Sequence, residues 1–454
     1  MKKYRLSALF LALVLSLSLA VPACAGIVED MEVAATAVLL ADGTTGEVLY
    51  EVNAHEKRYP ASITKVMTAM LVIEAVDEGR LALDKVVTVS ESAMKGLSAD
   101  GSNQNIKPGE ELTVKDLLYC ALVASANEAC NILAEVVSGS VEAFVGKMNE
   151  EAARLGMEGT HFANPHGLHS DDHYTTAYDI WLMAREAMKH PTFREIVSSV
   201  DYYVPETNKH AQRHFYNTNA LLTSWRYIGY TYRNAIGIKT GSTPEAGQCL
   251  VSAAVKDDKT LYAVVLGAEN VKDASGAIVD RQSFSESKRL LEWGFANFER
   301  RTILTTTDLQ GEVGVTLSQT EHVVAAPSGT LEATLPKDVT AADFTVTPTF
   351  FAESVEAPVE KGQVLGTVTV SYKGKEYGTM DLVALNAVER DEWMYRVSRV
   401  KAFFGQLWVK VVLIVLAVLV LVFLIRRLFL GGRRRRYGSR TYSGARRYRG
   451  GRRR

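Results

Sequence analysis

The sequence predicts an α/β (α+β) domain with one antiparallel sheet and packed helices, then a small C-terminal β-sandwich and one transmembrane helix. Three observations support this. Strand-like runs near both ends of residues 26–300 enclose a long helical stretch. Short alternating runs separated by Pro and Gly follow in residues 301–388. Residues 407–425 are almost wholly apolar and near the length that crosses a bilayer. At 454 residues the chain is too long for one compact core, so two domains with appended segments are expected.

The first strands are predicted to form a hairpin. Thr36–Leu40 and Glu47–Val52 are rich in β-formers and flank the glycine-containing loop Asp42–Gly46. A helix is predicted next, over Ser62–Gly79, with glycine as its stop signal. Its body is apolar nearly all round, so this helix should be buried at the centre of the domain.

The rest of the first domain completes the predicted sheet. Helical patterns dominate from Leu112 to about Lys189. Strands return at Ala235–Thr240 and in the hairpin formed by Cys249–Val255 and Leu261–Gly267, and Asp280–Arg300 has the pattern of an amphipathic helix. We expect an antiparallel sheet whose outer strands come from the two ends of this segment.

The second domain, residues 301–388, is predicted to be a small β-sandwich. Runs such as Gly366–Tyr372 alternate between apolar and polar residues and end at Pro and Gly turns. The domain contains no cluster of catalytic residue types, which favours a spacer or a binding module. Residues 389–406 then form a predicted amphipathic, aromatic-bearing juxtamembrane helix.

The charges are strongly segregated along the chain. Residues 426–454 contain 13 arginines and no Asp, Glu or Lys, so the net charge of −1 leaves about −14 on everything before them. A basic tail can indicate nucleic-acid binding. Here it directly follows the apolar segment 407–425, so we predict no nucleic-acid partner and a single-pass membrane protein whose C-terminal tail is cytoplasmic. A buried core helix is the alternative, but it would not end in so arginine-rich a tail.

The N-terminus has the pattern of a signal peptide over residues 1–25. Three basic residues precede the apolar stretch Leu9–Val21, and Ala23–Ala25 offers a cleavage site. Cleavage there would leave Gly26 first and send the body out of the cytoplasm. A lipoprotein signal at Cys24 is an alternative, although Pro22 fits such a signal poorly.

Three cysteines remain after that cleavage: Cys120, Cys130 and Cys249. The first two lie ten residues apart in a predicted helical region, about 15 Å along the axis, which is too far for a disulfide. An odd count without a C-x-x-C pattern argues against a disulfide framework and against a metal site. We therefore expect structural thiols, no metal and no cofactor.

Three short motifs carry the chemistry: Ser62-Ile-Thr-Lys65, Ser125-Ala-Asn127 and Lys239-Thr240-Gly241. Residues three apart on a helix share a face, so Lys65 can reach the Ser62 hydroxyl. A serine hydroxyl needs a base to become a nucleophile, and a lysine is a base only when neutral. Burial, the helix N-terminus and a second cation at Lys239 would all disfavour the ammonium form. Taken alone, Ser62 could be a helix N-cap and Lys65 a solvated lysine.

The other two motifs fit the walls of a cleft. Ser125 and Asn127, at i and i+2 in a non-helical link, can point the same way, the hydroxyl relaying a proton and the amide orienting substrate. A cation and a hydroxyl at a strand edge, from Lys239 and Thr240, suit a substrate carboxylate. Alternatively, Asn127 caps the following helix, and Lys239 is a solvated edge lysine.

Gly241 leaves room for a peptide to lie along the strand, which is recognition by strand addition. The backbone N–H groups of Ser62 and Ser242 are candidates for an oxyanion hole.

The joint order of S-x-x-K, S-x-N and K-T-G is known from β-lactamases and penicillin-binding proteins. Tyr59–Lys65, Leu122–Ala129, Phe162–Leu168 and Ile238–Gly247 resemble the D-alanyl-D-alanine carboxypeptidase family of low-molecular-mass penicillin-binding proteins. Residues 357–363 and the strands after them are similar to the C-terminal β-domain of that family. The resemblance implies a β-lactamase/transpeptidase-like fold for residues 26–300.

The resemblance also implies the reaction: removal of the terminal D-alanine from peptidoglycan stem peptides through an acyl-enzyme on Ser62, with inhibition by β-lactam antibiotics. Lys65 would be the base, Ser125 would assist catalysis, and Asn127 with residues 239–242 would bind substrate. His166 and His169 are candidate bases, but His166, in the loop Phe162–Leu168, is expected to be structural.

The chain departs from the family in its anchor, because it has a predicted transmembrane span in place of an amphipathic helix. Compared with class A β-lactamases, its second motif is S-A-N where they have S-D-N, and no Glu-x-x-Leu-Asn lies between the second and third motifs, so the glutamate that they use for deacylation is not evident. An endopeptidase, a β-lactamase and a non-catalytic penicillin-binding envelope scaffold remain alternatives.

Overall fold

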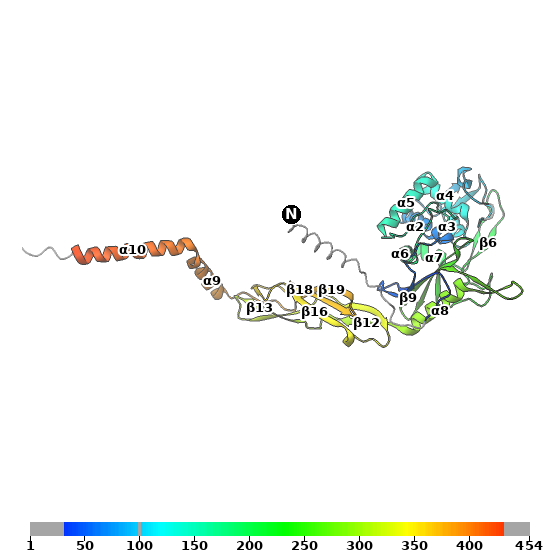
Figure 1. The fold of residues 1–454 in the computed structure, drawn as a ribbon. Coiled ribbons are helices and arrows are strands. Elements are labelled where there is room, and N and C mark those ends of the chain that lie inside the picture. The colour runs from blue at the N-terminus through cyan, green and yellow to red at the C-terminus, as the bar shows by residue number, and fades with distance from the viewer. Residues whose placement is uncertain (1–30, 99–100, 431–454) are drawn as a thin grey trace, which may run out of the picture. The chain divides into compact units, whose positions relative to one another are not determined.

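The computed structural model describes residues 31–98 and 101–430. The predicted signal peptide and residues 431–454 of the predicted tail lie outside the described residues. The chain divides into two compact units, and Figure 1 shows their elements. The first unit comprises the residues up to Thr305 together with Gly329–Val346 and Thr369–Gly378. The second comprises Thr306–Ser328, Thr347–Val368 and the residues from Thr379 onward.

The first unit is built on a five-stranded sheet with the order β2-β1-β9-β8-β7. Its strands are β1 (Ala37–Asp42), β2 (Val48–Val52), β7 (Ala235–Thr243), β8 (Gly247–Lys256) and β9 (Lys259–Ala268). Every neighbouring pair is antiparallel, which confirms the predicted type of sheet.

The strand order corrects the expectation that the outer strands of the sheet come from the two ends of the segment 26–300. The last strand of the sheet, β9, lies in the middle beside β1, and β7 forms the edge. Residues Leu261–Leu266 of β9 are all buried, which suits a strand paired on both sides. The edge strand β7 carries the polar residues Lys239, Thr240 and Ser242. One of the two edges of the sheet is therefore the strand with the third motif, and the other is β2.

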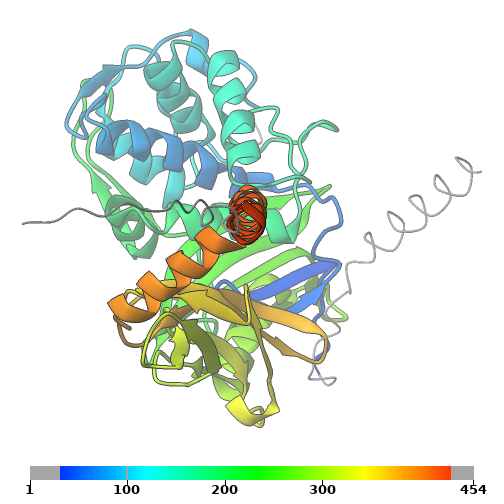
Figure 2. The same ribbon diagram turned by 90° about the vertical axis from the view of Figure 1, so that its left-hand side faces the viewer.

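Both faces of the sheet are covered by helices, as Figures 1 and 2 show. All residues of β1 are buried, and they alternate between two cores. Leu39 belongs to the core shared with the larger group of helices, whereas Leu40 packs in the second core with Leu290 and Leu291 of helix α8 (Gln282–Asn297). The apolar run of β1 reflects burial on both faces.

The helix that follows the first motif begins as a short 3₁₀ turn, η1 (Ala61–Thr64), and continues as α2 (Lys65–Asp77). All of its residues from Lys65 to Ile73 are buried, which agrees with the predicted central helix. Gly79, with φ of +72°, follows its end in the left-handed region that glycine adopts readily.

The remaining helices of this unit are α3 (Val114–Leu122), α4 (Asn127–Ser138), α5 (Val141–Arg154), α6 (Ala177–Ala187) and α7 (Pro191–Ser198). Short pieces complete it: β3 (Val86–Thr88), η2 (Ser92–Met94), β4 (Glu111–Thr113), β5 (Asp201–Val204), β6 (Arg213–Tyr216), β10 (Asn270–Lys272) and β11 (Ile278–Arg281). The break between α3 and α4 holds the second motif. Ser125 lies in this break with φ of +62°.

After α8 the chain forms β-structure, as predicted. The strands are β12 (Phe298–Leu304), β13 (Gly311–Thr316), β14 (His322–Pro327), β15 (Leu331–Pro336), β16 (Thr345–Phe350), β17 (Ser354–Glu356), β18 (Val364–Tyr372) and β19 (Lys375–Ala384), with a 3₁₀ turn η3 (Ala341–Asp343). They form a two-stranded sheet, β12-β15, and a six-stranded sheet, β16-β18-β19-β14-β13-β17.

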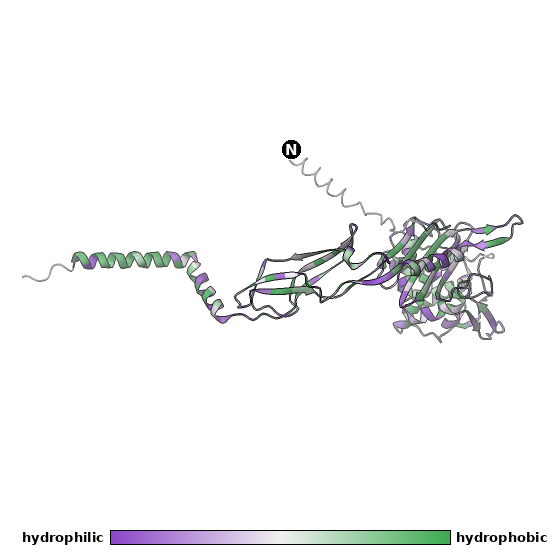
Figure 3. Ribbon diagram, turned by 90° about the horizontal axis from the view of Figure 1, so that it is seen from below, coloured by the Kyte–Doolittle hydropathy of each residue, from purple (hydrophilic) through white to green (hydrophobic). Residues whose placement is uncertain are grey.

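Two helices follow the sheets: α9 (Glu392–Gly405) and α10 (Leu407–Leu430). Figure 3 shows α10 hydrophobic along almost its whole length. Its 24 residues span about 36 Å, more than the hydrocarbon core of a bilayer. Among the described residues it is the one continuous helix long and apolar enough to cross a membrane; α4 and α5 pass the same test only as a pair bent by 85°.

Cys120, Cys130 and Cys249 are free and buried. Burial raises the pKa of the Cys130 and Cys249 thiols to about 11. They are therefore protonated at neutral pH, which agrees with the expected structural thiols.

Candidate active site

Ser62 lies in the turn η1, directly before helix α2, and is half-buried. The preceding residue, Ala61, has φ of +47°, a left-handed conformation that is unfavourable for alanine. The carbonyl group of Ala61 packs against Gly167, where an added Cβ would lie 1.9 Å from the Ala61 oxygen. A strained turn held by an outside loop is common at functional sites, where surrounding structure maintains it.

Lys65 is fully buried and donates three hydrogen bonds. Its Nζ lies 2.8 Å from Ser62 Oγ, 2.8 Å from Asn127 Oδ1 and 2.6 Å from the carbonyl oxygen of His166. Burial lowers the pKa of Lys65 to about 8, against smaller opposing effects of Cys130 and Glu128. A lysine with this pKa is neutral in an appreciable fraction of molecules near pH 7. It can therefore accept the proton of the adjacent hydroxyl.

A hydrogen bond joins Ser125 and Lys239. Lys239 is 1% exposed, and its Nζ donates to Ser125 Oγ at 3.1 Å and to the carbonyl oxygen of Thr240 at 3.0 Å. Burial, and then the charge of Lys65, hold the pKa of Lys239 well below its usual value. The structure thus joins the second and third motifs through a buried hydroxyl and a buried amine.

Asn127 links the second motif to the first. It is the first residue of α4, whose N-cap is Ala126, so Asn127 is not the helix cap considered from the sequence. Its side-chain oxygen accepts the bond from Lys65, and its backbone N–H donates to Ser102 at 2.8 Å. An added Cβ on Gly101 would lie 2.7 Å from Asn127 Nδ2, so the loop packs closely over the amide.

Gly241 brings strand β7 close to the turn η1. An added Cβ there would lie 2.9 Å from the carbonyl oxygen of Pro60 and 3.2 Å from the backbone nitrogen of Ser62. This close approach requires glycine. It also holds the N–H groups on which an oxyanion hole would depend near the edge of the sheet.

Thr240 and Ser242 flank this glycine. Thr240 Oγ1 lies 2.7 Å from Thr218 Oγ1. Ser242 is exposed, and its Oγ accepts a bond from Gln248 Nε2 at 2.9 Å. The hydroxyl of Thr240 is thus positioned by Thr218, whereas Ser242 is exposed to solvent.

The loop Phe162–Leu168 contributes through its backbone. The His166 carbonyl holds Lys65, and the imidazole Nδ1 accepts from the N–H of Leu168 at 3.2 Å. Burial and the nearby Lys65 lower the pKa of His166 to about 3, so the ring is neutral. The predicted structural role agrees with this geometry. His169, the other candidate, is exposed, and its Nε2 lies 3.5 Å from Asp171 Oδ1.

His173, which sequence reasoning missed, supports the turn η1. Its Nδ1 accepts from the Ala163 N–H at 3.0 Å, so its Nε2 carries the hydrogen and donates to Thr64 Oγ1 at 2.8 Å. Thr64 in turn donates to the carbonyl oxygen of Ala61 at 2.8 Å. Neither His173 nor Thr218 lies in a motif, so the sequence contained no signal for either.

A buried, deprotonatable lysine beside a serine, at the open edge of an antiparallel sheet, defines a serine hydrolase. Comparison with known families identifies it further. Residues 25–270 match the model described as D-alanyl-D-alanine carboxypeptidase, and residues 298–390 match the C-terminal domain of penicillin-binding protein 5. The chain therefore belongs to the D-alanyl-D-alanine carboxypeptidase family.

Individual relatives agree with this family. D-alanyl-D-alanine carboxypeptidase DacF of Bacillus subtilis is 33% identical over 75% of this chain and 82% of its own length. DacC of Escherichia coli is 32% identical over 84% of this chain and 88% of its own. The enzyme is accordingly a serine-type D-Ala-D-Ala carboxypeptidase, and the sequence-based prediction of its function is confirmed.

Solved structures confirm the fold. Penicillin-binding protein 5 from Haemophilus influenzae aligns over 80% of this chain and all of its own, with a TM-score of 0.64 and 30% identity. The Streptomyces K15 DD-transpeptidase aligns over 59% of this chain and all of its own, with a TM-score of 0.52 and 32% identity.

Proposed function

We propose that Ser62 is the nucleophile and Lys65 its general base. Ser62 Oγ attacks the carbonyl carbon of the terminal D-Ala–D-Ala bond while Lys65 Nζ takes the hydroxyl proton. The N–H groups of Ser62 and Ser242 stabilise the oxyanion. The departing D-alanine nitrogen receives a proton through Ser125, and water then hydrolyses the ester on Ser62.

One observation carries this assignment. Lys65 Nζ lies 2.8 Å from Ser62 Oγ, and burial lowers its pKa to about 8. The hydrogen-bond distance supplies the path for the proton, and the lowered pKa supplies the neutral amine. An ordinary surface lysine would meet neither requirement.

We assign substrate binding to the edge of the sheet. An extended peptide would pair with the free edge of β7, its terminal carboxylate near Lys239 and Thr240 and its amide near Asn127. This orientation is antiparallel to β7, since the carboxyl end lies at the earlier residues of the strand. A β-lactam with its carboxylate at the same place would acylate Ser62 and inhibit the enzyme.

We further propose that α10 is the membrane anchor. Its length and apolar surface support a single span, and Arg426 and Arg427 at its end favour a cytoplasmic C-terminus. The catalytic domain, residues 26–300, and the β-domain, residues 301–388, would then lie outside the cytoplasm, where peptidoglycan is found. The amphipathic α9, within residues 389–406, would lie at the membrane surface, and the arginine tail would contact anionic lipid.

Mass spectrometry of the full chain in detergent tests the mechanism. We expect release of D-alanine from a D-Ala-D-Ala pentapeptide and a persistent penicilloyl adduct on Ser62. Rapid penicillin turnover without peptide cleavage would favour a β-lactamase, and cleavage of cross-linked peptides would favour an endopeptidase. An adduct without peptide cleavage or penicillin turnover would favour the non-catalytic penicillin-binding scaffold, and the absence of any adduct would overturn the serine mechanism. An adduct that survives Ser62→Ala would overturn the serine mechanism.

A further inference from the structure

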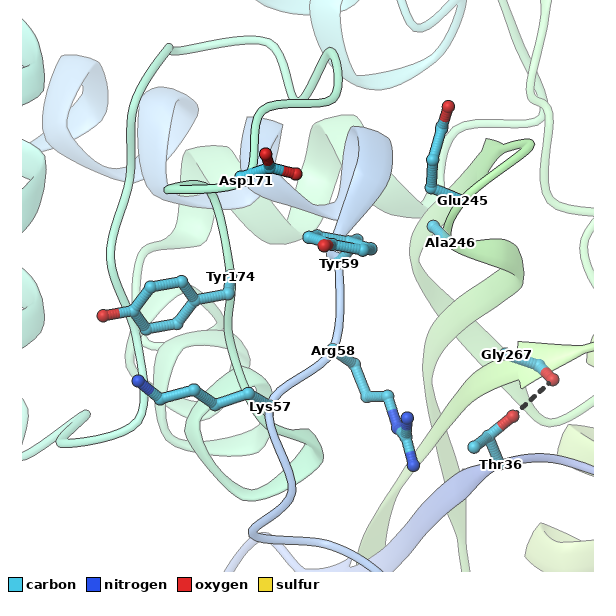
Figure 4. Close-up of a pocket in the computed structure, with 9 residues that line it drawn as sticks. All are labelled: Thr36, Lys57, Arg58, Tyr59, Asp171, Tyr174, Glu245, Ala246 and Gly267. Carbon is cyan, nitrogen blue, oxygen red and sulfur yellow. Dashed lines mark hydrogen bonds between the residues drawn. The ribbon is translucent and has the colours of Figure 1, made fainter.

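The groups around Ser62 differ in what surrounds them. A cavity of about 550 Å³ lies beside Tyr59, three residues before Ser62 (Figure 4). The amine of Lys65 is instead enclosed by protein, because the side chain is fully buried and Nζ has three protein acceptors. One of these acceptors, Asn127, is covered by residues 101–106. Whatever holds that segment in place therefore bears on the base.

Glu128, the second residue of α4, holds this segment. Its side chain is 2% exposed, and its Oε1 accepts from the backbone N–H of Gln104 at 2.5 Å and from that of Ile106 at 3.3 Å. The same helix end makes a third bond to the segment, from the N–H of Asn127 to the carbonyl oxygen of Ser102 at 2.8 Å. Residues 102–106 are thus fixed to the first turn of α4 at three points.

The segment in turn fixes the side chain of Asn127. Gly101 lies so close that an added Cβ would be 2.7 Å from Asn127 Nδ2. The other end of that amide, Oδ1, accepts from Lys65 Nζ at 2.8 Å. A continuous series of contacts therefore runs from the Glu128 carboxylate through residues 101–106 to the amide that positions the base.

The Glu128 carboxylate also places a negative charge in the interior. Its Oε2 is buried and has no hydrogen-bond partner among the residues that the structure describes. A charge that is only partly compensated by donors acts strongly on its neighbours in a medium of low dielectric constant. Burial lowers the pKa of Lys65, and the charges of Cys130 and Glu128 oppose this effect. Glu128 thus favours the ammonium form of the lysine.

Other titratable groups face Lys65 from several elements: Cys130 on α4, Lys239 on β7, and His166 and His173 between α5 and α6. Burial raises the pKa of Cys130 to about 11 and lowers that of each histidine to about 3, so these three are mainly neutral between pH 6 and 10. Lys239, when charged, disfavours a second ammonium. Among these groups Glu128 is the carboxylate that can balance a charge on Lys65.

We propose that Glu128 is a positioning residue for the acylation of Ser62, which fixes the Asn127 amide through residues 101–106 and stabilises, by its negative charge, the ammonium that Lys65 becomes. In this step the Ser62 O–H bond breaks as an N–H bond forms on Lys65, and Oγ bonds to the substrate carbonyl carbon. Glu128 exchanges no proton and touches no substrate. The inference rests on the proposed roles of Ser62 and Lys65.

Stopped-flow acylation by penicillin between pH 6 and 10, with the full chain in detergent, tests the charge. Glu128→Gln removes the charge and keeps an acceptor for the segment. We expect the midpoint of the limiting rate to move to lower pH by about 0.5 to 1 unit, because the neutral amine is then favoured. Above the midpoint the rate should fall about threefold, because a base of lower pKa is weaker. Glu128→Asp, which keeps the charge, should restore most of the midpoint.

The matched control is Glu142→Gln. Glu142 is the second residue of α5, as Glu128 is of α4, but it is exposed. Its replacement should leave both the midpoint and the limiting rate as they are in the wild-type protein.

Glu128→Ala tests the contact with residues 101–106, because it removes the acceptors together with the charge. We expect the same shift of the midpoint as for Glu128→Gln and a further loss of about tenfold in the limiting rate at every pH, since Asn127 is no longer held. Thermal unfolding of each variant shows that folded proteins are compared. If Glu128→Ala does not fold, the difference between Glu128→Gln and Glu128→Asp decides.

The outcomes separate this inference from the proposed function. A midpoint that Glu128→Gln leaves unchanged would overturn the role of the charge, and equal limiting rates for Glu128→Gln and Glu128→Ala would overturn the role of residues 101–106. A wild-type rate that does not depend on pH would instead overturn the role of Lys65 as the base.

Discussion

The carbonyl oxygen of His166 lies 2.6 Å from Lys65 Nζ, although 101 residues separate the two along the chain. With Ser62 Oγ and Asn127 Oδ1, this oxygen is the third acceptor around the amine. Three acceptors fix the position of the amine and would stabilise its charge, whereas burial opposes the charge more strongly. The balance brings the pKa of Lys65 to about 8, so part of the population carries a neutral amine near pH 7, as a general base requires.

The acylation rate should follow the titration of Lys65. At saturating penicillin we expect the rate to rise with pH, with a midpoint near 8, because only the neutral amine accepts the Ser62 proton. Lys65→Ala should lower the rate at least about 10³-fold. Stopped-flow acylation between pH 6 and 10 measures both effects. Normal acylation by the Lys65 variant would rule out its role as base.

The same titration should appear in the stability of the protein. Since the folded-state pKa of Lys65 is lowered, the unfolded chain binds more protons between about pH 8 and 10.5, and this lysine makes stability rise with pH. Lys65→Met should reduce the slope of the unfolding free energy by up to about 1.4 kcal/mol per pH unit in that window. Urea titrations at pH 8.5 to 10 measure the difference.

An exposed lysine provides the matched control for this experiment. Lys147→Met, on the surface of α5, should leave the slope as it is in the wild-type protein. Identical slopes for Lys65→Met and the wild type would contradict the titration of Lys65 in this window.

Lys239→Ala should weaken the binding of ligands that bear a carboxylate, by about 10²-fold, with less effect on the same β-lactam as its methyl ester. The buried amine has a lowered pKa, and an adjacent carboxylate favours its protonated form. Binding should therefore take up a proton, so affinity should fall as pH rises. Inhibition constants for acid and ester at several pH values measure this. Equal losses for both ligands would argue against carboxylate recognition.

Gly241→Ala should impair acylation by about 10²-fold, because its Cβ would meet Pro60 and Ser62 and push β7 away from the nucleophile turn. Penicillin acylation rates measure the loss. The control is Gly146→Ala in α5, where an added Cβ meets nothing within 4 Å. It should leave acylation unchanged and stabilise the helix by up to about 1 kcal/mol. Unimpaired acylation by the Gly241 variant would refute the requirement for close approach.

The parts of the site that depend on local geometry could be predicted from the sequence. Ser62 and Lys65 are three residues apart on a helix, so their contact follows from helix periodicity. The antiparallel sheet followed from alternating and apolar runs. The position of β7 at the edge did not, because strand order depends on pairings between residues more than 200 positions apart.

The long-range backbone contacts of the site could not be predicted from the sequence. Lys65 is held by a carbonyl group, which every residue has, so residue type could not identify His166 as its partner. Ala61 and Ser125 have positive φ, yet neither is a residue type that signals it. Thr218, which lies in no motif, contacts Thr240 of the third motif, and only the folded structure shows this contact.

The three buried thiols have a consequence for how the protein folds after export. Export would deliver the chain to an oxidising compartment, where cysteines exposed in an unfolded or partly folded chain can form wrong disulfides. In the folded protein, burial keeps all three as unreactive thiols. Folding would then have to outpace oxidation. Variants that loosen the packing of α3 or α4, which hold Cys120 and Cys130, should be lost as cross-linked aggregates before any defect in catalysis becomes visible.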